Sequence, residues 1–218
     1  MSVVDVHTAR AWMTEAARLV SEQADHLIEL DAAIGDGDHG TNLRRGFAAG
    51  MEALSSSEAT TPGVVLTTVG KAVIAKTGGA AGPLYGSALR RAGQTLGEVS
   101  QVDPAGLADA LRAALVAVQQ LGRADEGDKT MIDALAPAVR AYGEAVDAGT
   151  DLGGATRAAA DAAARGARAT VPLQARKGRA SYLGQRSVGH EDPGAASSAL
   201  IMRALEIVTG GTGTIAQA

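Results

Sequence analysis

Apolar residues recur at helical spacing along almost the whole chain, and this periodicity limits the fold more than any other feature. Residues 7–29 show it through Ala11, Trp12, Ala16, Leu19, Val20, Leu27 and Ile28. No alternation of strand and helix patterns indicates a parallel sheet, and the β-branched run at 64–69 fits a buried helix as well as a strand. The sequence therefore predicts an all-α bundle or barrel of about eight helices.

Glycine, proline and N-capping residues mark the expected ends of these helices. Helices are predicted over about 7–29, 38–53, 62–76, 82–96, 103–122, 128 or 130 to 148, 150 or 151 to 169, and 192–209. Residues 171–191 are predicted to form a long ordered loop. The chain is expected to be a single domain over residues 1–210, with a flexible tail over residues 211–218.

Composition excludes several classes of protein. Aromatic residues make up only 2% of the chain, so large aromatic clusters are excluded and small residues are expected to pack the helices closely. The net charge of −4 without a Lys/Arg stripe argues against nucleic-acid binding. Apolar runs are too short to cross a membrane, cysteine is absent, and the N-terminus lacks signal-peptide order. We therefore expect no membrane partner and a cytoplasmic location.

Three aspartates crowd one glycine-rich break between predicted helices. Asp31, Asp36 and Asp38 lie within eight residues, and their charges repel one another unless a cation is present. Carboxylates combined with substrate phosphates are the ligands that Mg²⁺ commonly uses, and glycines allow the chain to aim all three at one point. A magnesium site is predicted, with a solvated, N-capping acidic turn as the alternative.

Two other interpretations of this break fail. Gly35, Gly37 and Gly40 formally match a dinucleotide fingerprint, but the preceding segment looks helical and the carboxylates would repel a bare pyrophosphate. Counted from Asp36, the positions of an EF-hand that require Gly and Glu hold Thr41 and Phe47.

Three further breaks have the composition of phosphate sites. Glycines at 78, 79 and 82 can expose backbone N–H groups at a helix N-terminus, although a tight turn explains them equally well. Residues 122–130 nearly match a Walker A loop, but Asp128 interrupts the motif and no strand precedes it, so a helix cap at Asp128 or Thr130 remains the alternative.

The last break is basic. Arg176, Lys177, Arg179 and Arg186 lie within eleven residues, and Asp192 is expected to cap the final helix. Arginine suits bidentate phosphate contacts and stabilises charge during phosphoryl transfer, with a solvated basic loop as the alternative. Acids for a metal, glycines for phosphate and arginines for transferred charge together indicate a phosphoryl-transfer site.

At these four breaks the sequence closely resembles the L subunits of dihydroxyacetone kinases (DhaL). The resemblance covers essentially the whole chain and is carried by Asp31 with residues 34–42, 78–86, 127–133 and 174–195. It implies a closed barrel of eight antiparallel helices with the nucleotide site at one end. It also implies ADP or ATP as cofactor, held through two Mg²⁺ ions.

The resemblance assigns roles to individual residues. Asp31, Asp36 and Asp38 would ligate the metals, Met131 would pack on the adenine, and Arg179 would be catalytic, facing the transferred phosphate. The implied nucleotide contacts are His39, Gly40, Thr41, Asn42, Gly79, Ala80, Ala81, Gly122, Thr130, Met131, Arg179, Asp192, Pro193 and Gly194. Ala81 departs from the family, where this position is usually serine.

The resemblance also implies partner proteins. A separate K subunit would hold the ketose covalently on a histidine, and a phosphotransferase M subunit would recharge the bound ADP. The alternatives are an ATP-dependent kinase subunit for a related ketose or tetrose, and a regulatory module that signals its nucleotide state. A phosphate carrier acting through His39 or His190 is disfavoured, because acids surround His39. A homodimer is left open.

Overall fold

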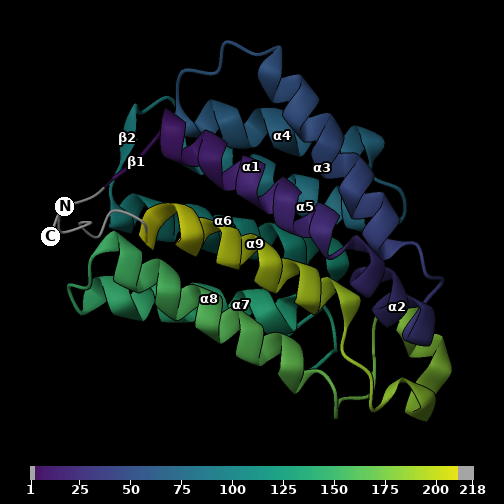
Figure 1. Cartoon of the computed structure of the whole chain (residues 1–218). Helices are drawn as coiled ribbons and strands as arrows, with labels where there is room; N and C mark the ends of the chain where they lie inside the picture. Colours follow the sequence, from purple (N-terminus) through teal and green to yellow (C-terminus); the bar gives the residue numbers. More distant parts are fainter. Residues whose placement is uncertain (1–2, 211–218) are drawn as a thin grey trace, which may run out of the picture.

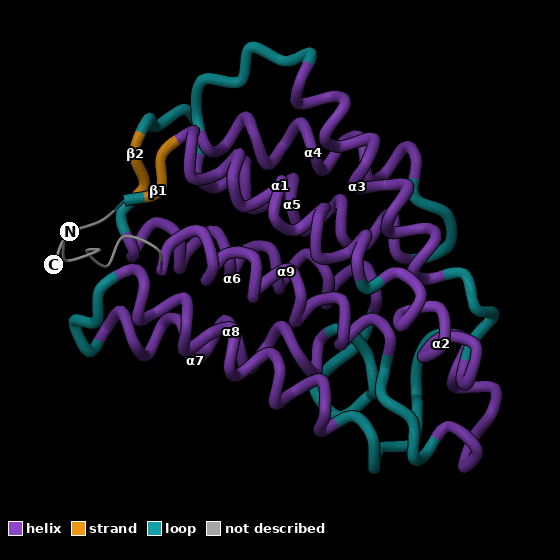
Figure 2. The backbone as a smooth tube through the Cα atoms, in the orientation of Figure 1, coloured by secondary structure: helices purple, strands orange, loops and turns teal. Residues whose placement is uncertain are grey.

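The computed structural model describes residues 3–210, which are mainly helical (Figure 2). In chain order the elements are β1 (Val4–Asp5), α1 (Val6–Glu22), α2 (Ala24–Ile34), α3 (His39–Ser55), α4 (Pro62–Lys76), α5 (Ala81–Leu96), β2 (Gln101–Val102), α6 (Pro104–Gly122), α7 (Ile132–Asp147), α8 (Leu152–Ala169), the 3₁₀ helix η1 (Arg179–Ser187) and α9 (Pro193–Gly210). The predicted all-α class is confirmed. The tail predicted over residues 211–218 lies outside the described residues.

The structure corrects the expected elements in four places. The single helix predicted over residues 7–29 is two helices, α1 and α2, which meet at Gln23, so residues 3–210 contain nine α-helices rather than about eight. The predicted loop at 171–191 contains η1. Val4 pairs with Val102 in a two-residue antiparallel ladder, which is too short to leave a periodic signal. The predicted cap of α7 at Asp128 or Thr130 is wrong, because the N-cap residue is Met131.

From α3 onward, each helix packs on the next one along the chain, and α1 packs on both the first and the last of them. The helices α3, α4, α5, α6, α7, α8 and α9 pack successively on one another, and α1 packs on both α9 and α3. These are the contacts that a closed ring of eight helices would make. Helix α2 lies outside this ring, beside η1, at the opposite end of the molecule from the β1–β2 pair (Figure 1).

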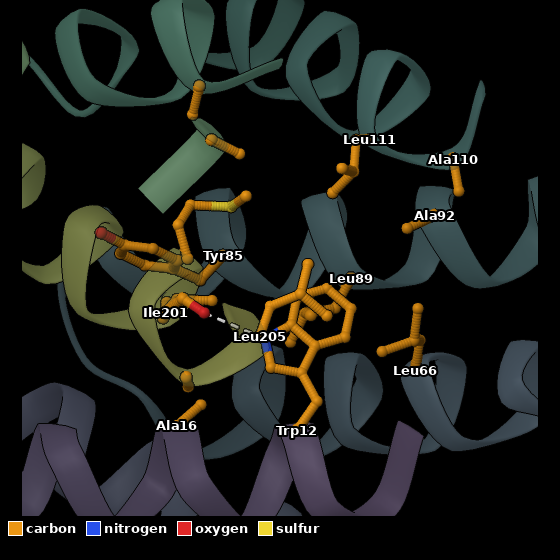
Figure 3. Close-up of a cluster of buried hydrophobic side chains, with 14 of the residues drawn as sticks. Trp12, Ala16, Leu66, Tyr85, Leu89, Ala92, Ala110, Leu111, Ile201 and Leu205 are labelled. Atoms are coloured by element: carbon orange, nitrogen blue, oxygen red, sulfur yellow. Dashed lines mark hydrogen bonds between the residues drawn. The ribbon is translucent and has the colours of Figure 1, made fainter. Parts of the chain in front are cut away.

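The core contains few aromatic side chains, as the composition predicts. Figure 3 shows Trp12 of α1 among aliphatic side chains, with its indole Nε1 donating a hydrogen bond of 3.0 Å to the carbonyl oxygen of Ile201. This bond satisfies the one polar atom of a buried indole and joins α1 to α9.

Glycines bring two helices into backbone contact. Gly63 and Gly70 on α4 face Gly93 and Gly86 on α5, so the glycines on each helix are seven residues, or about two turns, apart. A Cβ atom on Gly70 would lie 2.7 Å from the carbonyl oxygen of Gly86, and one on Gly86 would lie 2.6 Å from that of Gly70. The predicted close packing through small residues is confirmed here.

Within residues 3–210, none of the helices combines the length and the apolar character that crossing a bilayer requires.

Candidate functional site

All four glycine- and charge-rich breaks line one cavity of about 570 Å³. It is bordered by the end of α2, the starts of α3, α5, α7 and α9, the end of α6, and the segment that leads into η1. The predicted site residues that line it are Asp31, Asp36, Asp38, His39, Asn42, Gly79, Ala80, Ala81, Gly122, Thr130, Met131, Arg179, Asp192, Pro193 and Gly194. Residues far apart in the sequence therefore share one site.

Two predicted nucleotide contacts, Gly40 and Thr41, are not among the lining residues. Gly40 lies where α3 crosses α2, and a Cβ atom there would lie 2.0 Å from the carbonyl oxygen of Ala24. Thr41 is exposed. The packing of α3 on α2 is thus enough to require a glycine at position 40, and the contact of both residues with a nucleotide stays a prediction.

The three aspartates converge as predicted. One oxygen from each of Asp31, Asp36 and Asp38 lies within 4.8 Å of the others. Asp31 is 8% exposed, and its Oδ2 accepts hydrogen bonds from the backbone N–H groups of Asp38 (2.9 Å) and His39 (3.1 Å). These bonds hold the turn in place. Among residues 3–210, the one ion pair of this cluster joins Asp36 to Arg179, at 3.0 Å.

This cluster fits a divalent cation. Carboxylate oxygens are the hard ligands that Mg²⁺ prefers, and three acids facing a single arginine leave excess negative charge. Gly35 is required for the turn, since a Cβ atom there would lie 2.1 Å from Oδ1 of Asp31. The chain therefore keeps space around the Asp31 carboxylate that any side chain at position 35 would fill.

Three of the helices that start at the cavity lack a capping bond from the N-cap side chain. The helices α1, α4, α6 and α8 are each capped by a side chain, from Asp5, Thr61, Asp103 and Asp151 respectively. By contrast, the N-cap residues of α3, α5 and α7, which all line the cavity, make no side-chain capping bond. Side chains bind the N–H of His39 at the start of α3 and that of Ile132 at the start of α7, through Asp31 and Thr130. The other N–H groups of these first turns and the positive ends of the helix dipoles remain for a ligand, which suits phosphate.

The turn before α5 is tied to the first turn of α3. The guanidinium of Arg45 donates to the carbonyl oxygen of Lys76 (2.7 Å) and to Oδ1 of the buried Asn42 (2.7 Å). Gly79, at the end of this turn, has a φ of +64°, which favours glycine. Arg45 was not predicted as a site residue, because its role depends on a turn about thirty residues away in the sequence.

One wall of the cavity is apolar. It is formed by Leu84, Val118, Leu121, Met131 and Ile132, and Leu121 is 52% exposed. A flat aromatic ring fits such a wall, and a purine base is one example. Met131 and Gly122, which also lines the cavity, were predicted, whereas the aliphatic residues of α5 and α6 look like ordinary helix positions in the sequence.

The start of α9 completes the site. Oδ2 of Asp192 accepts a hydrogen bond of 2.8 Å from the backbone N–H of Ala195, which confirms the predicted cap. Burial raises the pKa of Asp192 to about 7. Tyr85 of α5 donates to the carbonyl oxygen of Gly194 (2.9 Å), which anchors α9 to the opposite side of the cavity.

His39 is held in the wall of the site. Its Nε2 lies 2.8 Å from Oγ of Ser197, and burial lowers the pKa of the imidazole. A ring nitrogen that is engaged in a packed hydrogen bond is a poor acceptor for a phosphoryl group. The contacts of His39 therefore agree with the sequence argument against a phosphohistidine at this position.

The fold and the site define the class of the protein. Residues 33–206 match the DAK2 domain, and the chain belongs to the DAK2 domain family.

Similar proteins include DhaL subunits of several bacteria. The chain is 37% identical over 196 residues to the ADP-binding subunit DhaL of the PEP-dependent dihydroxyacetone kinase of Escherichia coli (strain K12), covering 90% of this chain and 93% of that subunit. It is 39% identical over 201 residues to the ADP-binding subunit DhaL of PEP-dependent dihydroxyacetone kinase 1 of Listeria innocua, covering 92% and 96%. The family resemblance seen in the sequence is confirmed.

Larger kinases contain a similar region. The D-erythrulose kinase of Mycolicibacterium smegmatis is 41% identical over 189 residues, which cover 86% of this chain but 33% of that protein. The crystal structure of the dihydroxyacetone kinase from C. freundii in complex with AMP-PNP and Mg²⁺ is similar with a TM-score of 0.72 and 26% identity. The match covers 95% of this chain and 35% of that chain.

Proposed function

We propose that this protein is the nucleotide-binding subunit of a dihydroxyacetone-type kinase. It would hold ADP or ATP through Mg²⁺ and pass phosphate to a ketose on a separate K subunit, with a phosphotransferase M subunit recharging the ADP. One observation carries the proposal: the cavity combines three converging carboxylates, three helix N-termini whose N-cap side chains make no capping bond, and an apolar wall. A magnesium nucleotide needs all three. Such a subunit would work in the cytoplasm.

Each part of the cavity has a separate task in this proposal. Asp31, Asp36 and Asp38 would hold two Mg²⁺ ions, which when bound neutralise phosphate charge. The N–H groups at the starts of α3 and α5 would bind phosphate oxygens. Met131 and Leu121 would pack on the base, so that the phosphates point toward the aspartates.

Arg179 would stabilise the charge on the transferred phosphate. Its side chain is 70% exposed and reaches the Asp36 carboxylate at the rim of the cavity. A guanidinium there can contact a phosphoryl group that leaves toward a partner protein, because it offers several donors in a fixed plane. The hydroxyl that accepts the phosphate would come from the ketose on the K subunit.

Asp36→Asn tests the metal site. We expect Mg²⁺-dependent ADP affinity to fall by about 10–100-fold, since the variant loses one anionic ligand. The fold should persist, because the Asp36–Arg179 pair is largely exposed and such pairs contribute little to stability. Calorimetric titration of ADP with and without Mg²⁺ measures the change.

Asp161→Asn is the matched control for this experiment. Asp161 is an exposed aspartate on α8 and lies outside the cavity lining. The control should bind ADP like the unchanged protein. If Asp36→Asn also keeps its Mg²⁺-dependent affinity, the metal site assigned to the aspartates is wrong.

The phosphate donor can be identified by native mass spectrometry of protein purified with Mg²⁺ and without added nucleotide. Retained ADP with two Mg²⁺ ions would support recharging by a phosphorylated M subunit. An empty protein that binds ATP reversibly would support direct use of ATP. A protein that binds neither nucleotide when both are supplied would refute the proposed function.

A second candidate follows from the similarity to D-erythrulose kinase. In this case the chain would be an ATP-dependent kinase subunit for a related ketose or tetrose. Turnover assays with a K partner, in which dihydroxyacetone or erythrulose is combined with ATP or phosphorylated M subunit, separate the two candidates. No turnover in any combination, together with nucleotide-dependent binding to another protein, would instead indicate a regulatory module.

A further inference from the structure

A lysine lies fully buried in the wall of the cavity. Lys129, in the loop between α6 and α7, is 1% exposed and has a φ of +61°, which is unusual for a residue with a side chain. Burying an ammonium group is costly unless its donors find acceptors. The chain therefore maintains both a strained backbone position and a buried charge at this residue.

All three ammonium donors have backbone acceptors. The Nζ atom of Lys129 donates to the carbonyl oxygens of Thr170 (2.9 Å), Leu173 (3.1 Å) and His190 (2.5 Å). Two of these carbonyls precede residues 174–189 and one follows them; we call residues 174–189 the arm. One ammonium group thus joins both ends of the arm and fixes them to the loop that carries Met131.

The contacts of Lys129 exclude a direct phosphate role. Its three donors are all used, so none remains for a phosphate oxygen, and the rejection of a Walker A motif agrees with this geometry. Burial lowers the pKa of the ammonium, whereas the charges of Asp192 and Asp133 raise it. Within residues 3–210, no carboxylate forms an ion pair with it.

The arm carries Arg179, whose own contacts are few. Its guanidinium is mostly exposed and has one ion pair, with Asp36. Its position therefore depends on how the arm is held. Ala175, Ala180 and Leu183 of the arm pack with Ile34 of α2. At the base of the arm, the backbone N–H of Arg176 donates to the carbonyl oxygen of Asp128 (3.0 Å) and that of Gly189 to the carbonyl oxygen of Val171 (2.8 Å). Lys129 adds three bonds from a single charged group at the same base.

We propose that Lys129 is a positioning residue that sets the placement of Arg179 against the outer phosphates of the nucleotide. The inference rests on the proposed function. It adds a link between the part of the cavity that would hold the purine base and the part that would hold the phosphates. Lys129 belongs to the loop that would pack on the purine base, and its ammonium group is bonded to both ends of the arm that would face the phosphates. A shift of this loop would therefore also shift the arm.

Binding selectivity tests this proposal without a partner protein. The ratio of the affinities for Mg²⁺–AMP-PNP and AMP measures how much the outer phosphates contribute. We expect Arg179→Met to lower this ratio by about tenfold, as loss of a charged hydrogen bond implies, and Lys129→Met to lower it by a similar factor. The double variant should lose no more than Arg179→Met alone, because both changes remove the same contact.

A merely structural lysine gives a different result. Both affinities would then fall by the same factor, or the losses in the double variant would multiply, and either result would overturn the proposal. Lys71→Met, which removes an exposed lysine on α4, is the control for loss of charge and should keep the ratio. Hydrogen exchange should also show faster exchange over residues 174–189 in Lys129→Met than in this control.

Three unpaired carbonyls could prevent Lys129→Met from folding, and circular dichroism checks this. If Lys129→Met does not fold, Lys129→Gln is tested in its place, because the amide of glutamine keeps two donors although the side chain is shorter. We expect Lys129→Gln to lower the affinity ratio by a smaller factor. Lys129→Gln with an unchanged ratio would refute the role of Lys129 while leaving nucleotide binding intact. Failure of the unchanged protein to bind either nucleotide would instead refute the proposed function.

Discussion

At the scale of single residues, Ala81 stands out because the resemblance to DhaL subunits leads us to expect a serine at this position. It is the first residue of α5 and lines the cavity beside Gly79 and Ala80. Ala81→Ser would add a hydroxyl at a helix N-terminus that has no side-chain cap. We expect ADP affinity to rise by about 2–10-fold, the equivalent of one neutral hydrogen bond to a phosphate oxygen.

Calorimetric titration with Mg²⁺–ADP checks this prediction. Ala48→Ser, at an exposed position on α3, is the matched control and should leave the affinity unchanged. A hydroxyl at position 81 that caps the helix rather than binding phosphate would raise thermal stability without raising affinity. That result would mean that phosphate does not approach the first turn of α5.

Single residues also show which site features can be predicted from sequence. Asp31, Asp36 and Asp38 could be predicted, because their spacing alone brings three charges together whatever surrounds them. Leu121 and Lys129 could not be assigned to the site from sequence. An apolar helix residue and a lone lysine acquire their roles from residues that are distant in the sequence. For Leu121 this is Met131 in the same cavity wall, and for Lys129 it is the carbonyl groups of Thr170, Leu173 and His190.

At the scale of secondary structure elements, some helix starts can be predicted from local sequence signals and others cannot. Capping side chains at Asp103 and Asp151 are local signals, so the starts of α6 and α8 could be predicted. The break at Gln23 could not, because the residues on both sides keep helical periodicity and no glycine or proline interrupts them. Tertiary packing determines where such a boundary falls, so the sequence predicted a single helix where the structure has α1 and α2.

Asp192 makes the stability of α9 depend on pH. Burial raises its pKa to about 7, above the ordinary value of 3.8, while the nearby charge of Lys129 lowers it and that of Asp133 raises it. The folded state therefore prefers the neutral acid. The resulting stabilisation is fully present below the unfolded-state pKa and is lost as the pH rises through about 7.

We expect the free energy of unfolding of the nucleotide-free protein to fall by roughly 2–3 kcal/mol from this group between about pH 5 and 8. Urea unfolding at several pH values in the presence of a chelator measures it. Asp192→Asn keeps an oxygen that can accept the hydrogen bond from Ala195 but cannot ionise, so its slope against pH should be shallower. Equal slopes for the two proteins would show that Asp192 does not titrate in this range.

At the scale of the whole molecule, one end of the helix ring carries the cavity and also an unusual surface. Tyr182 of η1 is 89% exposed, which is uncommon for so large a side chain. Arg176 and Arg186 flank it in sequence, and neither forms an ion pair with any residue of the described range 3–210. Tyrosine and arginine are enriched among the residues that contribute most to protein–protein binding.

This surface lies where a partner must approach. In the proposed function, phosphate transfer would bring the ketose within contact distance of the nucleotide, so the K subunit would dock at the cavity mouth. Arg179, at the first position of η1, borders the cavity, and Tyr182 lies about one turn further along the same element. The proposed function therefore places Tyr182 in the interface with the K subunit.

Tyr182→Ala should weaken binding of the K subunit by about 10–30-fold, as loss of a central tyrosine typically does. Affinity for Mg²⁺–ADP should stay unchanged, because Tyr182 does not line the cavity. Surface plasmon resonance with immobilised K subunit and parallel ADP titrations measure the two quantities. Val99→Ala, an exposed apolar position beside β2 at the opposite end of the molecule, is the control (Figure 1). Unchanged K-subunit binding by Tyr182→Ala, or equal weakening by Val99→Ala, would mean that the partner docks elsewhere.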